Sequence, residues 1–179
     1  MTKTEKMLPK LSLVLGGAAS GKSDWAENLL LSSGLKPVYL ATARVLDGET
    51  ETKVARHRSR RSVAWHTLEA DLDLGPPLSG RAPDEAVLLD CATMWLTNHL
   101  IDGNDLDAAQ SALLGTVQDC PCPVVVVSNE VGHGIVPQNA MARDFRERQG
   151  RLNIALAGAA DLVVLVTAGL PQVLKGTRP

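Results

Sequence analysis

The chain has 179 residues, of which 45% are hydrophobic, and carries a formal net charge of −2 at pH 7. This length fits one domain of ordinary size, and the charge argues against general binding of nucleic acid. No apolar run approaches the roughly 20 residues of a membrane span, and the charged N-terminal residues do not form a signal peptide. We therefore expect a cytoplasmic protein in which a flexible extension at residues 1–9 precedes one domain at residues 10–179.

The first predicted strand, residues 11–15, leads into a glycine-rich loop that ends in Gly21, Lys22 and Ser23. Residues 16–23 match the phosphate-loop pattern G-x-x-x-x-G-K-[ST], and a helical pattern follows at residues 22–31. The glycines let backbone N–H groups approach phosphate oxygens, Lys22 would contact the β- and γ-phosphates, and Ser23 would bind Mg²⁺. The strand before the loop and the helix after it disfavour the alternative, a glycine-rich turn that binds nothing.

Further along the chain, apolar runs alternate with helical patterns, as in a parallel sheet with crossover helices. The pattern predicts strands at residues 11–15, 37–41, 65–68, 86–89, 123–127 and 162–167. It predicts helices at residues 22–31, 50–61, 93–100, 106–117 and 139–159, and a surface loop rich in proline and glycine at residues 75–85. The predicted fold class is α/β: a single P-loop NTPase-like domain whose mainly parallel sheet is flanked by helices on both faces.

Ligands of such sheets bind at the carboxyl ends of the strands, so the residues after each run are candidates for the site. Asp90 ends the run at 86–89 and is the candidate for holding the Mg²⁺ shell, as the second acidic motif of a P-loop enzyme does. Its alternative role is to cap the helix that follows. Thr42, Ala43 and Arg44 follow the run at 37–41. Asn129 and Glu130 follow the run at 123–127, where a substrate could reach them, although the nearby glycines could simply shape a turn.

A basic segment surrounds His57 with Arg56, Arg58, Arg60 and Arg61. Four guanidinium groups near one imidazole would lower its pKa and gather phosphate oxygens. Because neutral imidazole is a nucleophile toward phosphorus, His57 is a candidate for covalent catalysis. By spacing alone, the alternative of an exposed and simply solvated basic helix face is the stronger interpretation.

Six segments carry a resemblance to a known family: residues 16–23 (GGAASGKS), 39–43 (YLATA), 55–61 (ARHRSRR), 88–98 (LLDCATMWLTN), 128–153 (SNEVGHGIVPQNAMARDFRERQGRLN) and 169–175 (GLPQVLK). In this order they resemble the bifunctional adenosylcobinamide kinases and adenosylcobinamide-phosphate guanylyltransferases of cobalamin biosynthesis. The phosphate loop is shared with many unrelated proteins, whereas ARHRSRR followed by NEVGHGIVP is specific to the family. The resemblance covers nearly the whole chain, from residue 11 to residue 175.

The resemblance implies an enzyme that phosphorylates the aminopropanol hydroxyl of adenosylcobinamide with ATP or GTP and then transfers GMP from GTP to that phosphate. The product is adenosylcobinamide-GDP. The second reaction would pass through a GMP-histidine intermediate, and the matching position here is His57. The family also implies a homotrimer that acts on a corrinoid small molecule and has nucleotide sites near its subunit contacts.

Carried over by position, the family's nucleotide contacts fall on Gly16, Gly17, Ala18, Ala19, Ser20, Gly21, Lys22, Ser23, Thr42, Ala43, Arg44, Arg58, Ser59, Arg60, Arg61, Glu69 and Asp90. His57 and Lys22 are the expected catalytic residues, and Ser23 and Asp90 are the expected Mg²⁺ ligands. Glu69 stands out only through the resemblance. The chain departs from the family at Ala19, where relatives usually carry arginine, a loss that would weaken the grip on the triphosphate.

Two other functions stay open at the level of the sequence. A plain P-loop kinase of another small alcohol needs Lys22, Ser23 and Asp90 but not His57. A nucleotide-dependent switch is disfavoured, because the chain lacks the N-K-x-D loop with which Ras-like switches read guanine. No residues are assigned to the corrinoid pocket, since helical amphipathicity favours core packing for Trp25 and Trp95.

Overall fold

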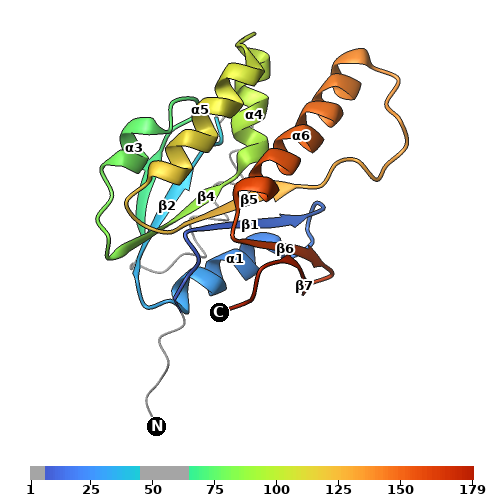
Figure 1. Ribbon diagram of the computed structural model, residues 1–179. Coiled ribbons are helices and arrows are strands. Elements are labelled where there is room, and N and C mark those ends of the chain that lie inside the picture. Colours follow the sequence, from blue (N-terminus) through green and yellow to red (C-terminus); the bar gives the residue numbers. More distant parts are fainter. Residues whose placement is uncertain (1–6, 45–64) are drawn as a thin grey trace.

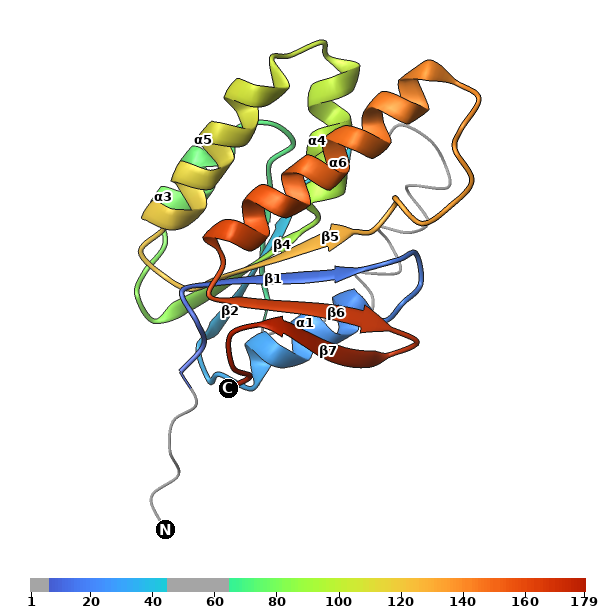
Figure 2. The same cartoon turned by 45° about the vertical axis from the view of Figure 1, so that its right-hand side comes forward.

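The computed structural model describes residues 7–44 and 65–179, and the predicted helix at residues 50–61 lies outside them. Figures 1 and 2 show the arrangement of the chain. In chain order the elements are β1 (Leu11–Gly16), α1 (Lys22–Leu31), β2 (Lys36–Ala41), β3 (His66–Glu69), α3 (Gly75–Ser79), β4 (Glu85–Asp90), α4 (Ala92–Ile101), α5 (Leu106–Asp119), β5 (Val124–Asn129), α6 (Ala140–Ala159), β6 (Leu162–Thr167) and β7 (Leu170–Lys175).

The strands form one seven-stranded sheet in the order β3-β2-β4-β5-β1-β6-β7. Neighbouring strands are parallel except β6 and β7, which pair antiparallel. Because β5 lies between β4 and β1, the carboxyl ends of these three strands are adjacent. Figure 2 shows the phosphate loop after β1 and the connection from β5 to α6 at this same end of the sheet. The topology therefore places the candidate site where α/β sheets bind their ligands.

Helices cover both faces of the sheet, with α1 on one face and α3 to α6 on the other (Figure 1). Leu13 and Leu15 belong to the core cluster that includes residues of α4, α5 and α6. Val14, which lies between them in β1, belongs to the cluster that includes residues of α1. Since successive side chains of a strand point to opposite faces, a sheet covered on both sides needs apolar residues at every position. This explains the unbroken apolar runs of the sequence.

Most predicted elements are confirmed, and so is the fold class. The helix predicted at residues 22–31 coincides with α1, and the one predicted at 139–159 is α6 with Asn139 as its N-cap. Leu152 and Leu156 are buried on α6, and Phe145 packs against the same cluster. The short strand predicted at 65–68 is β3, which starts and ends one residue later. Apolar runs and helical periodicity thus predicted the strands and helices of the described residues except α3 and β7.

Three expectations need correction. Residues 75–85 are not a surface loop throughout, because α3 begins at Gly75 and Leu78 is fully buried; proline suits a first helical turn, which needs no backbone N–H donor. The antiparallel strand β7 was not predicted. It follows a two-residue turn in which Ala168 and Gly169 both have positive φ, as tight hairpins require. Leu8, assigned to the flexible extension, is buried in the α1 cluster.

Within residues 7–44 and 65–179, no helix combines the length and the apolar character needed to cross a membrane.

Candidate functional site

The phosphate loop is shaped by its own backbone and by the turn before β7. Gly16 cannot carry a side chain, since an added Cβ would overlap Ser20 Oγ and lie 2.7 Å from the carbonyl oxygen of Val166. Gly21 has a φ of 89°, and its Cβ would lie 3.1 Å from Gly169 Cα. The amide of Gly169 donates to the carbonyl of Ser20 at 2.8 Å, which ties the loop to that turn. Glycine is therefore required at both ends of the motif.

Lys22 begins α1 and is buried, with its ammonium donating to the carbonyl of Gly17 at 3.0 Å. Burial lowers the pKa of Lys22, an effect that the nearby carboxylate of Asp90 opposes. Gly21, the N-cap of α1, provides no side-chain cap, so the first N–H groups of the helix keep their capacity to bind an anion. The loop thus combines a fixed cation with the positive end of a helix, which is the arrangement that binds nucleotide phosphates.

Ala19 lies in the loop with a φ of 54°, an uncommon conformation for a residue with a side chain. Ala18 and Ala19 are exposed, Gly17 and Ser20 are half-buried, and Ser23 is half-buried in the first turn of α1. The side chain at position 19 therefore points to a place that an arginine could fill without disturbing the core. Alanine gives the loop one cation fewer than the arginine that the family resemblance implies at this position.

Asp90 ends β4 and accepts a hydrogen bond from Tyr39 Oη at 2.7 Å. It does not cap α4, because the N-cap of that helix is Cys91, which makes no side-chain cap bond. The alternative role of Asp90 as a helix cap is therefore wrong. Burial and the neighbouring Asp90 raise the pKa of the Cys91 thiol to about 12, so that thiol stays protonated beside the site. Asp90 keeps a second carboxylate oxygen for a ligand.

Thr42, at the end of β2, is fully buried and links β2 to the junction of β4 and α4. Its hydroxyl donates to the carbonyl of Cys91 at 2.7 Å and accepts from the amide of Cys91 at 2.9 Å. Asn98 of α4 donates to the carbonyl of Thr42 at 2.8 Å and to that of Asp71 at 3.0 Å. The side chain of Thr42 thus stabilises the fold. A nucleotide that bonded to its hydroxyl would have to compete with the backbone of Cys91.

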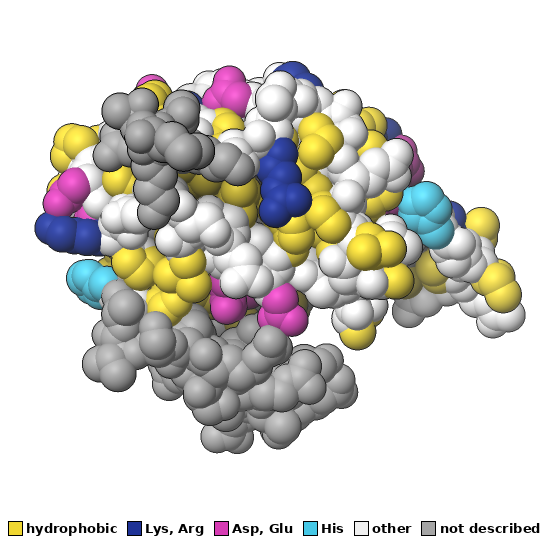
Figure 3. Space-filling view, turned by 90° about the horizontal axis from the view of Figure 1, so that it is seen from below, with side chains coloured by type: hydrophobic (Ala, Val, Ile, Leu, Met, Phe, Trp, Pro, Cys, Tyr) yellow, Lys and Arg dark blue, Asp and Glu magenta, His cyan; other side chains and the backbone are white. Residues whose placement is uncertain are grey.

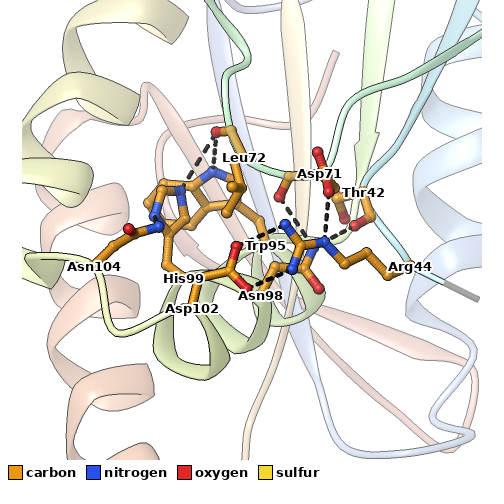
Figure 4. Close-up of polar contacts among 9 residues, drawn as sticks. All are labelled: Thr42, Arg44, Asp71, Leu72, Trp95, Asn98, His99, Asp102 and Asn104. Carbon is orange, nitrogen blue, oxygen red and sulfur yellow. Dashed lines mark hydrogen bonds and ion pairs between the residues drawn. The ribbon is translucent and has the colours of Figure 1, made fainter. Parts of the chain in front are cut away.

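Arg44 lies between two carboxylates, as Figure 4 shows. Its Nε donates to Asp71 at 2.5 Å, and its two terminal nitrogens form a forked pair with Asp102 at 2.7 and 2.8 Å. These bonds raise the pKa of Arg44 and lower those of Asp71 and Asp102. A forked arginine–carboxylate pair fixes geometry as well as charge. Arg44 therefore joins the end of β2 to the C-terminal end of α4, and its predicted contact with nucleotide stays a prediction.

A pocket of about 260 Å³ lies beside this cluster, between α4, α5 and the connection from β3 to α3. Trp95 and His99, whose rings are 4.5 Å apart, form one wall, and both are directed at the carbonyl of Leu72 in Figure 4. Asn104 holds the other ring nitrogen of His99 at 3.1 Å. The polar atoms of this wall are thus paired with one another, and the residues that line the pocket include none of the phosphate loop.

Asn129 and Glu130 continue β5 beside the phosphate loop. The amide of Glu130 donates to the carbonyl of Gly16 at 3.0 Å, and Asn129 lies opposite Gly16 in the strand register. The carboxylate of Glu130 accepts from Asn153 Nδ2 at 3.1 Å and lies 3.1 Å from His133 Nε2. The structure therefore places Glu130 at the edge of the candidate site. Its neighbour in α6, Asn153, was not singled out from the sequence.

The signal that could have found this network is present in α6. Gln149 and Asn153 are buried polar residues, and they share a helical face with Phe145, Leu152 and Leu156. A polar side chain on the apolar face of a helix has to find a partner in the core. Here both amides form hydrogen bonds with the hydroxyl of Ser128 in β5, and Asn153 also donates to the carbonyl of Asn129.

Two predicted carboxylates flank one strand end. In the strand register Ala41 of β2 lies opposite Glu69 of β3 on one side and Asp90 of β4 on the other. The order of the strands then places β5 and β1 beyond Asp90. The structure thus places Glu69, Asp90 and the phosphate loop at the carboxyl end of the sheet. His57, Arg58, Ser59, Arg60 and Arg61 lie outside the described residues.

The connection between β5 and α6 projects from the body of the molecule (Figure 1). Hydrophobic side chains gather at the protruding end in the view of Figure 3. Ile135 is 97% exposed, and Val136 and Met141 are 64% and 65% exposed. Large apolar side chains that gather on an exposed projection mark a surface suited to an interaction.

Comparison with known proteins gives a consistent result. Residues 12–174 match the model of a family described as cobinamide kinase / cobinamide phosphate guanyltransferase. The chain is 43% identical over 167 residues to the bifunctional adenosylcobalamin biosynthesis protein CobP of Pseudomonas aeruginosa, covering 92% of this chain and 96% of that protein. It is 40% identical over 179 residues to the corresponding protein CobU of Salmonella typhimurium, covering 91% of this chain and 98% of that protein.

Solved structures resemble the fold at low sequence identity. The flagellar accessory protein FlaH from Methanocaldococcus jannaschii has a TM-score of 0.52 at 13% identity, with 96% of this chain and 80% of that chain covered. An ATPase from the type III secretion system of pathogenic bacteria has a TM-score of 0.57 at 10% identity, with 91% of this chain and 54% of that chain covered. At these identities the likeness supports the P-loop α/β fold alone.

Proposed function

The chain belongs to the cobinamide kinase / cobinamide phosphate guanyltransferase family, and we propose that it carries out both of the reactions that this family name describes. It phosphorylates adenosylcobinamide and then transfers GMP from GTP to the phosphate, which yields adenosylcobinamide-GDP. The observation that carries the proposal is the phosphate loop, in which buried Lys22 and the uncapped start of α1 meet. It occurs in a chain that shares 43% of its residues with a bifunctional relative over nearly its whole length.

In the kinase step, the phosphate loop binds the triphosphate of ATP or GTP through its backbone N–H groups. Lys22 neutralises charge on the γ-phosphoryl group as it moves to the acceptor hydroxyl. The hydroxyl of Ser23 and the carboxylate of Asp90 fit Mg²⁺, since it prefers hard oxygen ligands and a few protein contacts beside those of the phosphates. A bound Mg²⁺ would neutralise phosphate charge. Tyr39 holds one oxygen of Asp90 and so orients the other.

In the GMP-transfer step, we assign the nucleophile to His57, on the basis of the family motif in which it lies. Its imidazole attacks the α-phosphate of GTP, pyrophosphate leaves, and the phosphate of adenosylcobinamide phosphate then takes over the GMP. Arg58, Ser59, Arg60 and Arg61 are proposed to bind the phosphates beside it. Thr42, Ala43, Arg44 and Glu69 are proposed as further nucleotide contacts, supported by the position of Ala41 between Glu69 and Asp90.

We further propose that the protein is a cytoplasmic homotrimer. The exposed apolar residues Ile135, Val136 and Met141 support an interface between subunits, because their burial would remove a large apolar surface from water. Analytical ultracentrifugation of the protein tests this, and three times the mass of the single chain is expected. A monomer that persists at high concentration would contradict the proposal.

The direct test of function uses the purified protein with adenosylcobinamide and Mg²⁺. With ATP alone, mass spectrometry should detect adenosylcobinamide phosphate. With GTP added, it should detect adenosylcobinamide-GDP and pyrophosphate. Formation of the phosphate without the GDP product would indicate a plain kinase, and absence of both products would contradict the assignment.

A further inference from the structure

Glu130 lies beside the phosphate loop, and neither proposed reaction assigns it a role. Its backbone amide is bonded to the carbonyl of Gly16 at 3.0 Å, and the ammonium of Lys22 is bonded to the carbonyl of Gly17 at 3.0 Å. The main chain of Glu130 and the ammonium of Lys22 are therefore anchored on consecutive residues of the phosphate loop. β5, which leads to Glu130, is the direct neighbour of β1 in the sheet.

The carboxylate of Glu130 is oriented by a buried side chain. Asn153 donates to Oε1 at 3.1 Å, and Asn153 is only 5% exposed. The other end of the Asn153 amide accepts from Ser128 Oγ at 2.6 Å and from Gln149 Nε2 at 3.0 Å, and both of these residues are buried. An amide bonded at both ends cannot rotate freely, so it fixes the oxygen that it contacts. This network holds Glu130 from the core side.

The second oxygen of Glu130 faces outward. Oε2 lies 3.1 Å from Nε2 of His133, whose side chain is 86% exposed, whereas the side chain of Glu130 itself is 27% exposed. An exposed imidazole on a surface loop can move aside, while the bond to Asn153 remains. Glu130 thus presents one fixed, accessible carboxylate oxygen at the edge of the phosphate loop.

Other carboxylates at this edge are less suited to accept a proton from a substrate. Asp90 accepts a hydrogen bond from Tyr39 and is proposed as a ligand of Mg²⁺, so both of its oxygens have other partners. Glu69 is the last residue of β3, and three strands separate β3 from β1 in the sheet. At a spacing of about 4.8 Å per strand, Glu69 lies well away from the loop that holds the γ-phosphate.

We propose that Glu130 is the general base of the kinase step; this rests on the proposed function. Oε2 accepts the proton of the aminopropanol hydroxyl as the hydroxyl oxygen forms its bond to the γ-phosphorus. The bond between that phosphorus and the bridging oxygen breaks, and ADP or GDP leaves with the electron pair. An alcohol is a weak nucleophile at neutral pH, and a positioned base contributes about 10²- to 10⁴-fold to such a step.

The GMP-transfer step gives Glu130 no comparable task. Its nucleophile in the first half is a neutral imidazole, and its acceptor in the second half is a phosphate oxygen that is already ionised at neutral pH. Loss of the base should therefore slow phosphorylation and leave GMP transfer unchanged. Loss of a merely structural residue should affect both reactions.

The test is Glu130→Gln, because glutamine keeps the size of the side chain and an oxygen that accepts from Asn153 but does not take up the proton. The kcat for phosphorylation of adenosylcobinamide by ATP should fall about 10²- to 10⁴-fold. The KM for ATP should change less than about twofold, as expected for a group that acts in the transition state. Labelling of the protein by GTP labelled at the α-phosphate should be unchanged. Glu147→Gln is the matched control, since Glu147 lies on the exposed side of α6 and pairs with Arg151.

Three outcomes would overturn the inference. One is a Glu130→Gln enzyme that keeps its kcat, and another is an equal loss of phosphorylation and labelling, which would indicate a structural role. The third is a loss that excess Mg²⁺ restores, which would make Glu130 part of the metal shell. If the unmodified protein forms no adenosylcobinamide phosphate, the proposed function itself fails, and that result is visible before any variant is measured.

Discussion

The phosphate loop and Glu130 follow neighbouring strands, yet the fold holds them in different ways. Backbone geometry shapes the loop: Gly16 and Gly21 sit where a Cβ would collide with neighbouring atoms, and the bond from Gly169 fixes Ser20. Side chains hold Glu130, through Asn153. The loop is thus encoded within eight consecutive residues, whereas the support of Glu130 comes from Asn153 of α6, 23 residues further along the chain.

The two regions tolerate different substitutions. A site shaped by backbone accepts new side chains wherever a Cβ has room and fails where it has none. A site held by buried amides depends on each of those amides, because a lost partner leaves a polar group unpaired in the core. Lys22→Ala and Gly16→Ala change the first region and Asn153→Ala changes the second, and each leaves the other region intact.

Lys22→Ala should have the largest effect. The change removes the cation that stabilises the transferring phosphoryl group, so the kcat of phosphorylation should fall about 10²- to 10³-fold. The melting temperature should not fall, because burial of this charge costs free energy, as its lowered pKa indicates. Steady-state kinetics and thermal unfolding check both parts, with Lys36→Ala, an exposed lysine paired with Asp84, as the control. Normal phosphorylation by Lys22→Ala would show that the loop is not the nucleotide site.

Gly16→Ala and Gly17→Ala test whether the loop tolerates a side chain only where a Cβ has room. The added methyl group at residue 16 meets Ser20 and the carbonyl of Val166, whereas at residue 17 it meets no atom of residues 7–44 or 65–179 within 4 Å. Gly16→Ala should lower the free energy of unfolding by about 3 kcal/mol, at the upper end of the range for overpacking. Gly17→Ala should change it by less than about 1 kcal/mol. Chemical denaturation measures both, and equal effects would mean that backbone shape does not limit the loop.

Asp90→Asn tests the carboxylate at the end of β4, the strand on the other side of β5 from β1. Asparagine can still accept from Tyr39, so the fold should persist, but the charge that attracts Mg²⁺ is lost. The Mg²⁺ concentration needed for half-maximal phosphorylation should rise about 10- to 100-fold. Asp84→Asn, which changes an exposed carboxylate at the other end of β4, should leave it unchanged. An unaltered Mg²⁺ requirement in Asp90→Asn would remove Asp90 from the metal site.

Asn153→Ala should disturb the side-chain-held region alone. It removes the partner of Ser128 and Gln149 in the core, at a cost of about 1–2 kcal/mol in the free energy of unfolding. Glu130 loses its fixed oxygen, so phosphorylation should slow while binding of nucleotide to the loop persists. Ile154→Ala, one residue away and 74% exposed, is the control. If nucleotide affinity fell as much as kcat, the two regions would not be independent.

The sequence was informative where structure depends on neighbouring residues. The loop from Gly16 to Ser23, the strand before it and α1 after it were all predicted, because motif and periodicity act over a few residues. The same holds for Asp90, which simply ends an apolar run. Long-range pairing was not accessible in this way: the hairpin of β6 and β7 depends on the turn at Ala168, and the burial of Leu78 depends on the helices that surround it.

Side-chain partners were the hardest part to predict. Arg44 was expected at the nucleotide, a contact that stays a prediction, and the structure shows that its guanidinium bridges Asp71 and Asp102, which lie 27 and 58 residues away. Asn153 carried a signal, a polar residue on an apolar helical face, but its partners follow from the packing of α6 against β5. Such pairs depend on tertiary structure, which a single sequence does not display.

A covalent intermediate at His57 is the most direct test of the proposed GMP transfer. Mixed with Mg²⁺ and GTP labelled at the α-phosphate, in the absence of any corrinoid, the protein should retain the label through alkaline denaturation and lose it in warm acid, as a phosphoramidate does. GTP labelled at the γ-phosphate should leave nothing on the chain, and His57→Ala should abolish the adduct while phosphorylation of adenosylcobinamide at least partly remains. An adduct that persists in His57→Ala, or an unmodified protein that never takes up the label, would contradict the account.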